Sequence, residues 1–189
     1  MDRELTLSNG VWFEQHIAGI IQSRFPESVI LHDVHVFSKY LSLIKNHDYS
    51  TQIDLIAILP CGIYVIEAKK WNYEIVGDRD DELWTGKSNP KSFIQNVSPI
   101  LQNMCHIRAL RNLLRINNYD VPRFESCICV PDDTNIVSNC GEVMELSQLI
   151  YKLGVDMLYL MEGKRGKELD IKYWEQAIAD TLRKQNRNS

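Results

Sequence analysis

The chain has 189 residues, of which 44% are hydrophobic and 24% are charged, and its formal net charge at pH 7 is -4. This length fits one domain, and the hydrophobic content excludes a disordered or fibrous protein. The acidic balance speaks against a protein that coats nucleic acid non-specifically, although it leaves room for a local basic face.

The sequence favours a cytoplasmic protein that does not cross a membrane. The best candidate for a membrane span, residues 53–66, contains Asp54 and a Pro-Cys-Gly interruption, so it is too short and too polar. The first ten residues lack the apolar segment of a signal peptide. Five cysteines, an odd number without the spacing of a metal site, fit a reducing compartment. We expect a single domain over residues 1–189.

The first predicted element is a helix over residues 9–25, with Val11, Ile17 and Ile21 on one apolar stripe. Glu14 falls inside this stripe. A carboxylate on a buried face needs a partner, because an unpaired buried charge is costly. That partner is either an arginine or backbone group, or a polar site that the helix helps to build.

Three predicted strands follow, at residues 28–37, 52–59 and 62–69, and a Pro-Cys-Gly turn joins the last two. These two strands carry apolar residues on both faces, which is typical of central strands that are covered on both sides.

The second half of the chain shows a less regular succession of predicted helices and strands. Residues 70–90 are expected to form a loop or irregular strand. A helix is predicted within 91–117, with Ser98 as its cap and Pro99 at its first position.

The remaining predicted elements are a strand at 124–130, a short strand at 142–146, a helix from its cap Ser147 to about 161, and a last helix at 170–184. This order favours an α/β fold with a mixed sheet over a doubly wound repeat.

The hairpin predicts a cluster of polar side chains. A tight turn at Pro-Cys-Gly places Asp54 opposite Glu67 and Gln52 opposite Lys69. Opposed residues on neighbouring strands point to the same face, about 5 Å apart at their Cβ atoms. These four side chains should therefore cluster at the end of the hairpin away from its turn.

Two such carboxylates repel each other, and a divalent cation such as Mg²⁺ or Mn²⁺ relieves the repulsion. Lys69 can neutralise a carboxylate, or it can orient a water molecule and stabilise charge that develops on a phosphate. The same residues also fit a purely structural salt network in the sheet.

The pattern resembles the PD-(D/E)xK phosphodiesterase superfamily and, more closely, its nuclease-related domain family. The resemblance covers roughly residues 8–130. Phe13, Leu55 and Ser98 depart from the glycine, histidine and asparagine that are usual in the family at these places. The matching residues are Gly10, Glu14, Thr51-Gln52-Ile53-Asp54, the run from Gly62 through Glu67-Ala68-Lys69 to Trp71, then Trp84, Pro99 and Gln102.

The resemblance implies a restriction-endonuclease-like fold, with a mixed β-sheet flanked by helices on both faces. It implies a DNA endonuclease or nickase that uses Mg²⁺ or Mn²⁺. The metal ligands would be Asp54, Glu67 and the carbonyl group of Ala68.

The resemblance also implies the roles of three further residues. Lys69 would lie beside the attacking water. Glu14 would complete the site from the first helix, directly or through a water. Gln102 would approach from the later helix to contact the substrate or the lysine.

The expected partner is DNA, with single-stranded and branched forms among the candidates. The sequence lacks the G-x-x-x-x-G-K-[ST] motif, so any ATP-driven step would require a motor or helicase partner. The rival interpretation is a module that binds nucleic acid or a protein partner and keeps the nuclease fold with little activity.

Residues 84–123 carry six Lys or Arg residues and one acidic residue. Arg108, Arg111 and Arg115 share a helical face, which can contact a phosphate backbone or remain a solvated surface. His106 lies one turn after Gln102, where packing is favoured over catalysis. The aromatic residues of the predicted site region can stack on bases or pack in the core; they are Trp71, Tyr73 and Trp84.

Overall fold

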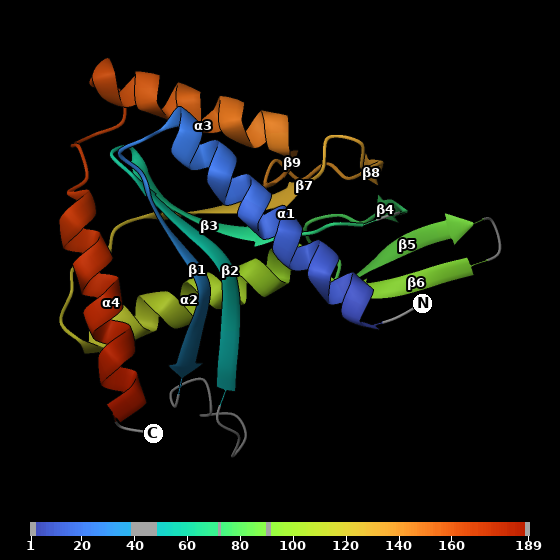
Figure 1. Cartoon of the computed structure of the whole chain (residues 1–189), viewed down its shortest axis with the longest axis horizontal. Helices are drawn as coiled ribbons and strands as arrows, with labels where there is room; N and C mark the ends of the chain where they lie inside the picture. Colours follow the sequence, from blue (N-terminus) through green and yellow to red (C-terminus); the bar gives the residue numbers. More distant parts are fainter. Residues whose placement is uncertain (1–2, 39–48, 72, 90–91, 188–189) are drawn as a thin grey trace.

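The computed structural model describes residues 3–38, 49–71, 73–89 and 92–187 (Figure 1). This part of the chain is a mixed α/β structure, as the order of predicted elements indicated. Its helices are α1 (Arg3–Arg24), α2 (Pro99–Ile116), α3 (Leu146–Met161) and α4 (Ile171–Arg187). None of these described helices combines the length and apolar character needed to span a bilayer.

The main sheet has five strands and mixed pairing. Strands β1, β2 and β3 are antiparallel, whereas β7 and β9 continue the sheet from β3 in parallel. Its order is β1 (Val29–Ser38), β2 (Tyr49–Leu59), β3 (Gly62–Ala68), β7 (Phe124–Val130) and β9 (Val143–Glu145).

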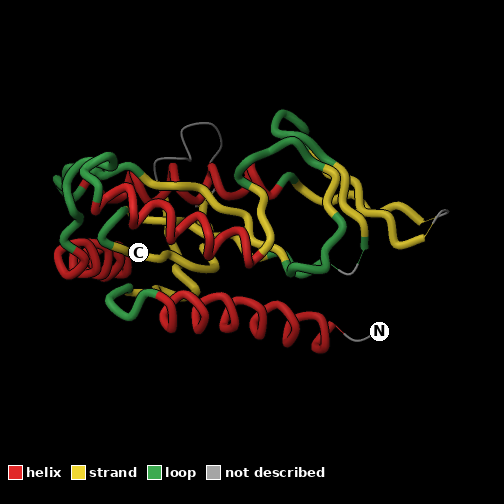
Figure 2. The backbone as a smooth tube through the Cα atoms, turned by 90° about the horizontal axis from the view of Figure 1, so that it is seen from above, coloured by secondary structure: helices red, strands yellow, loops and turns green. Residues whose placement is uncertain are grey.

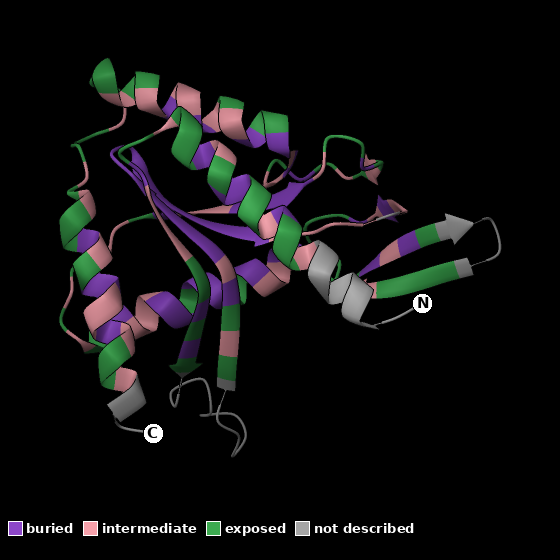
Figure 3. Ribbon diagram, in the orientation of Figure 1, coloured by how far each residue is buried: buried purple, intermediate pink, exposed green. Residues whose placement is uncertain are grey.

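The buried side chains of β2 and β3 divide between two clusters. Leu55 and Ile66 pack in the cluster that includes α1 and α3. Ile56 and Val65 pack in the cluster that includes α2 and α4. Figure 3 shows β3 buried along its length. This packing explains why both strands are apolar on two faces.

A second, four-stranded sheet was not predicted. Figures 1 and 2 show its β5–β6 hairpin extending beyond the main sheet. The residues expected to lead into the long helix form β6, so the helix begins only at Pro99. The strand order is β6 (Ser92–Val97), β5 (Leu83–Asn89), β4 (Glu74–Val76) and β8 (Ile136–Val137).

Helix α1 begins at Arg3, six residues before the predicted start, and of the two predicted caps Ser98 and Ser147 only the first is correct. Ser98 caps α2, and its hydroxyl accepts a hydrogen bond from the Leu101 N–H at 3.4 Å. The prediction that Ser147 caps α3 was wrong. Glu145 is the cap, and Gln148 completes a capping box. Ser147 therefore lies inside the first turn, where its N–H donates to the Asp132 carboxylate at 2.8 Å.

Candidate active site

The hairpin has the predicted register. Leu55 pairs with Ile66, and the ladder continues to the turn. One residue beyond this ladder, Asp54 Oδ2 accepts a hydrogen bond from the Ala68 N–H at 2.8 Å. This hydrogen bond holds the Asp54 carboxylate against β3, the strand that carries Glu67.

Glu67 is a buried carboxylate, with 1% of its surface exposed, and both of its oxygens are engaged. Oε1 lies 2.6 Å from Lys69 Nζ, and Oε2 accepts a hydrogen bond from His106 Nε2 at 3.0 Å. Burial raises the pKa of Glu67, but the His106 hydrogen bond and the Lys69 charge outweigh it and hold the pKa below its ordinary value.

The Lys69 ammonium joins the sheet to helix α2. It donates a hydrogen bond to Gln102 Oε1 at 3.2 Å, in addition to its contact with Glu67. Its backbone N–H donates to the Cys129 carbonyl at 2.9 Å, which fixes the end of β3 against β7. The structure therefore brings Gln102 to the predicted lysine.

His106 connects three elements. Because the Glu67 carboxylate only accepts hydrogen bonds, His106 Nε2 carries the proton in this contact. In the neutral ring Nδ1 then accepts from the Thr51 hydroxyl at 2.6 Å. Sequence reasoning missed both contacts, and the spacing of His106 from Gln102 was the one available signal.

Asn103 fixes helix α2 on the sheet. Its Nδ2 donates at 2.9 Å to the Val65 carbonyl and at 2.9 Å to the Ser126 hydroxyl. Asn103 is fully buried. Its hydrogen bonds fix the position of α2 along the sheet, and with it the position of the neighbouring Gln102 relative to Lys69. No sequence motif indicated this role.

Glu14 contributes negative charge from α1. Burial is the main cause that raises its pKa, and the charges of Asp33 and Glu67 raise it further against the opposing charge of Lys69. Half-buried Glu14 thus belongs to the same electrostatic environment as the hairpin carboxylates.

Asp54 shows the excess of negative charge most clearly. Burial raises its pKa to about 7, and the charges of Glu67 and Glu14 add to this effect. The Ala68 hydrogen bond and the Lys69 charge lower it only in part. A proton or another cation near Asp54 would therefore be bound favourably at neutral pH.

Gln52 does not join this cluster, contrary to the prediction. Its amide donates to Asp33 Oδ1 at 2.6 Å, across β1 and β2. The reason is a change of side-chain direction near Asp54. Ile53 and Ile56 are three residues apart and would point to opposite faces of a regular strand, yet both pack in the same core cluster. Asp33 lies on β1 opposite Asp54, and its backbone has a positive φ of 51°.

The described ranges contain no group of three or more His, Cys, Asp or Glu side chains gathered closely enough to hold a metal ion. The available donors, Asp54 and Glu67, are nevertheless the hard oxygen ligands that Mg²⁺ and Mn²⁺ prefer. In this arrangement the Glu67 oxygens are held by Lys69 and His106, so a metal would have to compete with these contacts.

Two other groups named from the sequence lie outside this cluster. Arg108 and Arg115 are exposed on α2 and form no ion pair with any residue that the structure describes. Trp84 is fully buried and its Nε1 donates to the Asp78 carbonyl, so it is a core residue. Trp71 and Tyr73 are half-buried.

Comparison with known proteins identifies the family. The sequence profile of the nuclease-related domain matches residues 9–131. An uncharacterized protein of Bacillus anthracis is 36% identical over 86 residues, which cover 45% of this chain and 36% of that protein. The chain thus spans about a third of the length of this curated relative. No solved structure matches. Since the profile covers well over half of the chain, the protein belongs to the nuclease-related domain family.

Proposed function

We propose that this chain is a Mg²⁺- or Mn²⁺-dependent DNA endonuclease or nickase with a restriction-endonuclease-like fold. The observation that carries the proposal is the convergence of Asp54, Glu67 and Lys69 at one end of the β2–β3 hairpin, with Gln102 on the lysine. Family membership adds support, because the family is described as nuclease-related.

Asp54 and Glu67 would hold the divalent ion, together with the Ala68 carbonyl. The raised pKa of Asp54, caused by burial and by the neighbouring carboxylates Glu67 and Glu14, favours a cation at this position. When bound, such an ion stabilises negative charge on a phosphate and lowers the pKa of water.

Lys69 would position the nucleophilic water and the phosphate. A protonated lysine has three donor hydrogens and no acceptor, so it cannot be a metal ligand. Glu67 and Gln102 account for two of its hydrogen bonds. The third donor hydrogen can then bind a water molecule or a phosphate oxygen, while the contact with Gln102 keeps the ammonium group in place. Glu14 would bind water from the α1 side.

A second candidate function is a nucleic-acid- or partner-binding module with little activity. The observation in its favour is that both Glu67 oxygens are occupied by Lys69 and His106. The absence of three gathered metal donors among the described residues points the same way. A motor or helicase partner is compatible with either function and is proposed only for an ATP-driven step.

The test is incubation of supercoiled plasmid, single-stranded DNA and branched DNA with Mg²⁺, Mn²⁺ or EDTA. We expect divalent-dependent nicking by the wild type and none by Asp54→Asn. Asp80→Asn, which changes an exposed carboxylate in a loop, is the matched control and should cut normally. DNA binding without cleavage under every condition would favour the binding module instead.

A further inference from the structure

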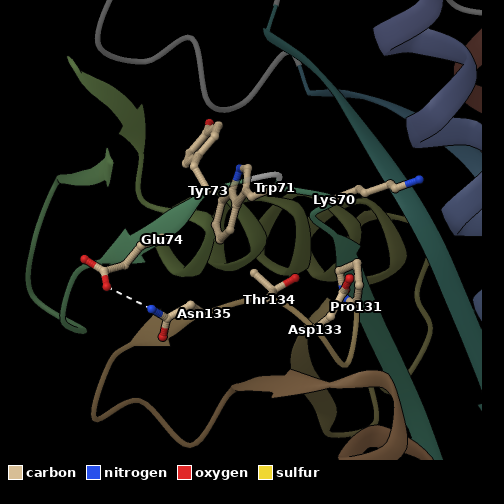
Figure 4. Close-up of a pocket in the computed structure, with 8 residues that line it drawn as sticks. All are labelled: Lys70, Trp71, Tyr73, Glu74, Pro131, Asp133, Thr134 and Asn135. Atoms are coloured by element: carbon tan, nitrogen blue, oxygen red, sulfur yellow. Dashed lines mark hydrogen bonds between the residues drawn. The ribbon is translucent and has the colours of Figure 1, made fainter. Parts of the chain in front are cut away.

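A pocket of about 420 Å³ lies beside the candidate active site (Figure 4). This volume falls within the ~300–1,000 Å³ that is usual for small-ligand sites. On the basis of the nuclease function proposed above, we propose that the pocket binds one nucleobase of the substrate and prefers bases that carry an exocyclic amino group. The lining residues that carry the argument are Trp71, Tyr73, Glu74, Asp133, Thr134 and Asn135.

The pocket lies where the carboxyl ends of the parallel strands β3 and β7 meet. Trp71 follows Lys69 by two residues, which limits their Cα separation to about 7 Å. On the other strand, Pro131 follows Val130 directly, and the Lys69 N–H is bound to the Cys129 carbonyl. Crevices at the carboxyl ends of parallel strands are the usual ligand sites of α/β folds. A base next to a phosphate held at Lys69 is therefore within reach.

Two aromatic rings form one side of the pocket, and the core holds both of them in place. The Trp71 ring packs on the fully buried Trp84, with 6.4 Å between the ring centroids. The Tyr73 ring lies so close to Gly86 that any Cβ added there would collide with it. Half-buried rings that are already ordered can stack on a base at little entropic cost.

The polar side of the pocket suits a neutral base better than a phosphate. Asp133 is an exposed carboxylate, which repels phosphate and can accept a hydrogen bond from the amino group of cytosine or adenine. Glu74 is a second carboxylate in the wall, and its oxygens are held by neighbours: Oε2 accepts from Asn135 Nδ2 at 2.8 Å, and Oε1 lies 3.3 Å from Lys87 Nζ. Lys70 does not offset the Asp133 charge, because its ammonium lies over the Trp12 ring, 4.8 Å from the centroid, and points away from the pocket in Figure 4.

Thr134 adds a second polar group to this wall. Its hydroxyl oxygen is buried and has no hydrogen-bond partner among the described residues. A buried polar atom without a partner costs free energy unless a ligand or water satisfies it. The hydroxyl can both donate and accept, so it can serve either edge of a base.

The experiment uses the full chain in EDTA, so that binding is measured without cleavage. Fluorescence anisotropy compares two single-stranded oligonucleotides of equal length, oligo-dC and oligo-dU. Cytosine presents the 4-amino donor and an N3 acceptor at the base edge, and uracil presents the O4 acceptor and an N3–H donor. We expect oligo-dC to bind at least about fivefold more tightly, the lower limit for one well-formed base contact. Trp71→Ala should weaken both complexes about tenfold or more, and Trp71→Phe should retain most of the affinity.

Asp133→Asn is the second variant, chosen because this residue lies on an exposed turn and its replacement does not disturb the core. It should shift the preference toward oligo-dU, since an amide can donate to the uracil O4. The control is Tyr151→Ala, which removes an exposed aromatic ring from α3 and should change neither affinity. Circular dichroism checks that each variant folds.

Equal affinity for the two oligonucleotides, or an unchanged ratio in Asp133→Asn, would overturn the base site. The result is independent of nuclease activity. A dC preference that depends on Trp71, in a protein that cuts nothing with any metal, would support the base site and refute the nuclease. Cleavage without any base preference would do the reverse.

Discussion

Glu67 and His106 form a buried hydrogen bond of 3.0 Å between strand β3 and helix α2. Only 1% and 3% of their surfaces are exposed. The bond fixes the carboxylate proposed as a metal ligand, and Thr51 fixes the histidine in turn. His106 is therefore a positioning residue in the proposed site: it acts on the chemistry through Glu67.

The first prediction concerns this histidine. His106→Ala leaves one oxygen of a buried carboxylate without its donor, so the free energy of unfolding should fall by about 1–3 kcal/mol. His106→Gln can donate from its amide and should recover part of the loss. Urea denaturation measures both. His16→Ala, an exposed change on α1, is the control, and equal stability of His106→Ala and wild type would contradict the role.

The second prediction is a pH dependence due to Asp54. Its pKa is about 7 in the folded protein, against an ordinary value of 3.8, because of burial and the charges of Glu67 and Glu14. The folded state thus binds the proton more tightly than the unfolded chain. The contribution of Asp54 to stability is greatest below pH 4 and is lost as the pH rises through 7.

Asp54→Asn removes this titration. Without divalent ions it should be more stable than wild type at pH 8, by roughly 1–4 kcal/mol, and nearly equal to it at pH 4. Urea denaturation in EDTA at both pH values measures the difference, with Asp80→Asn as the exposed control. If the variant is less stable than wild type at pH 8, the negative charge of Asp54 does not destabilise the folded protein.

The hairpin could be predicted because its signals are local. The Pro-Cys-Gly turn sets the register that brings Asp54 to β3, and the Ser98-Pro99 pair sets the start of α2. The second sheet could not be predicted. Its strands β4 and β8 have only three and two residues, and in β5 Gly86 lies against the Tyr73 ring, a contact that no local pattern encodes.

The same distinction holds in the site. Asp54, Glu67 and Lys69 follow from the hairpin register, whereas Gln102 was indicated by the family motif alone. Thr51 contacts His106 because α2 packs across the sheet at the end of β2 that carries Thr51. No local sequence pattern encodes this packing. Gln52 was misplaced because the face change in β2 results from packing, not from the order of apolar residues.

The third prediction concerns a buried network that holds α3 and the segment after it on the hairpin. Asp156 accepts hydrogen bonds from the Tyr64 hydroxyl at 2.7 Å and from Lys152 at 2.8 Å, and it pairs with Arg165. Asp156→Ala leaves the buried Tyr64 hydroxyl without its acceptor and removes the partner of Lys152, while Arg165 keeps Glu125, so the change should cost about 1–3 kcal/mol in unfolding free energy. Asp180→Ala on α4 is the control, and a loss below about 1 kcal/mol would contradict the prediction.

The fourth prediction tests the basic face of α2. Changing Arg108, Arg111 and Arg115 together to Ser should weaken DNA binding and reduce its salt dependence. Each lost contact with a duplex phosphate lowers the slope of log affinity against log salt by about 0.9. Anisotropy titrations at several salt concentrations measure the slope. An unchanged slope would mean that these arginines form only a solvated surface.

The last prediction separates the role of Lys69 from that of the carboxylates. Its ammonium lies 2.6 Å from Glu67 Oε1 and 3.2 Å from Gln102 Oε1. In Lys69→Met this competing positive charge is gone, so Mn²⁺ affinity should stay the same or increase. Cleavage should fall at least ~10²-fold, the effect usual for a positioned proton-transfer group. Asp54→Asn should instead lose metal binding and cleavage together.

Calorimetry with Mn²⁺ and nicking of supercoiled plasmid, on the same preparations, distinguish the two variants. Lys172→Met, an exposed change on α4, is the matched control and should alter neither measurement. If Lys69→Met cuts at the wild-type rate, the lysine serves only as the structural counter-ion of Glu67. If it loses Mn²⁺ binding as Asp54→Asn does, then the ammonium holds Glu67 in the orientation that the metal requires, and its contact with Gln102 has to be understood as part of the metal site.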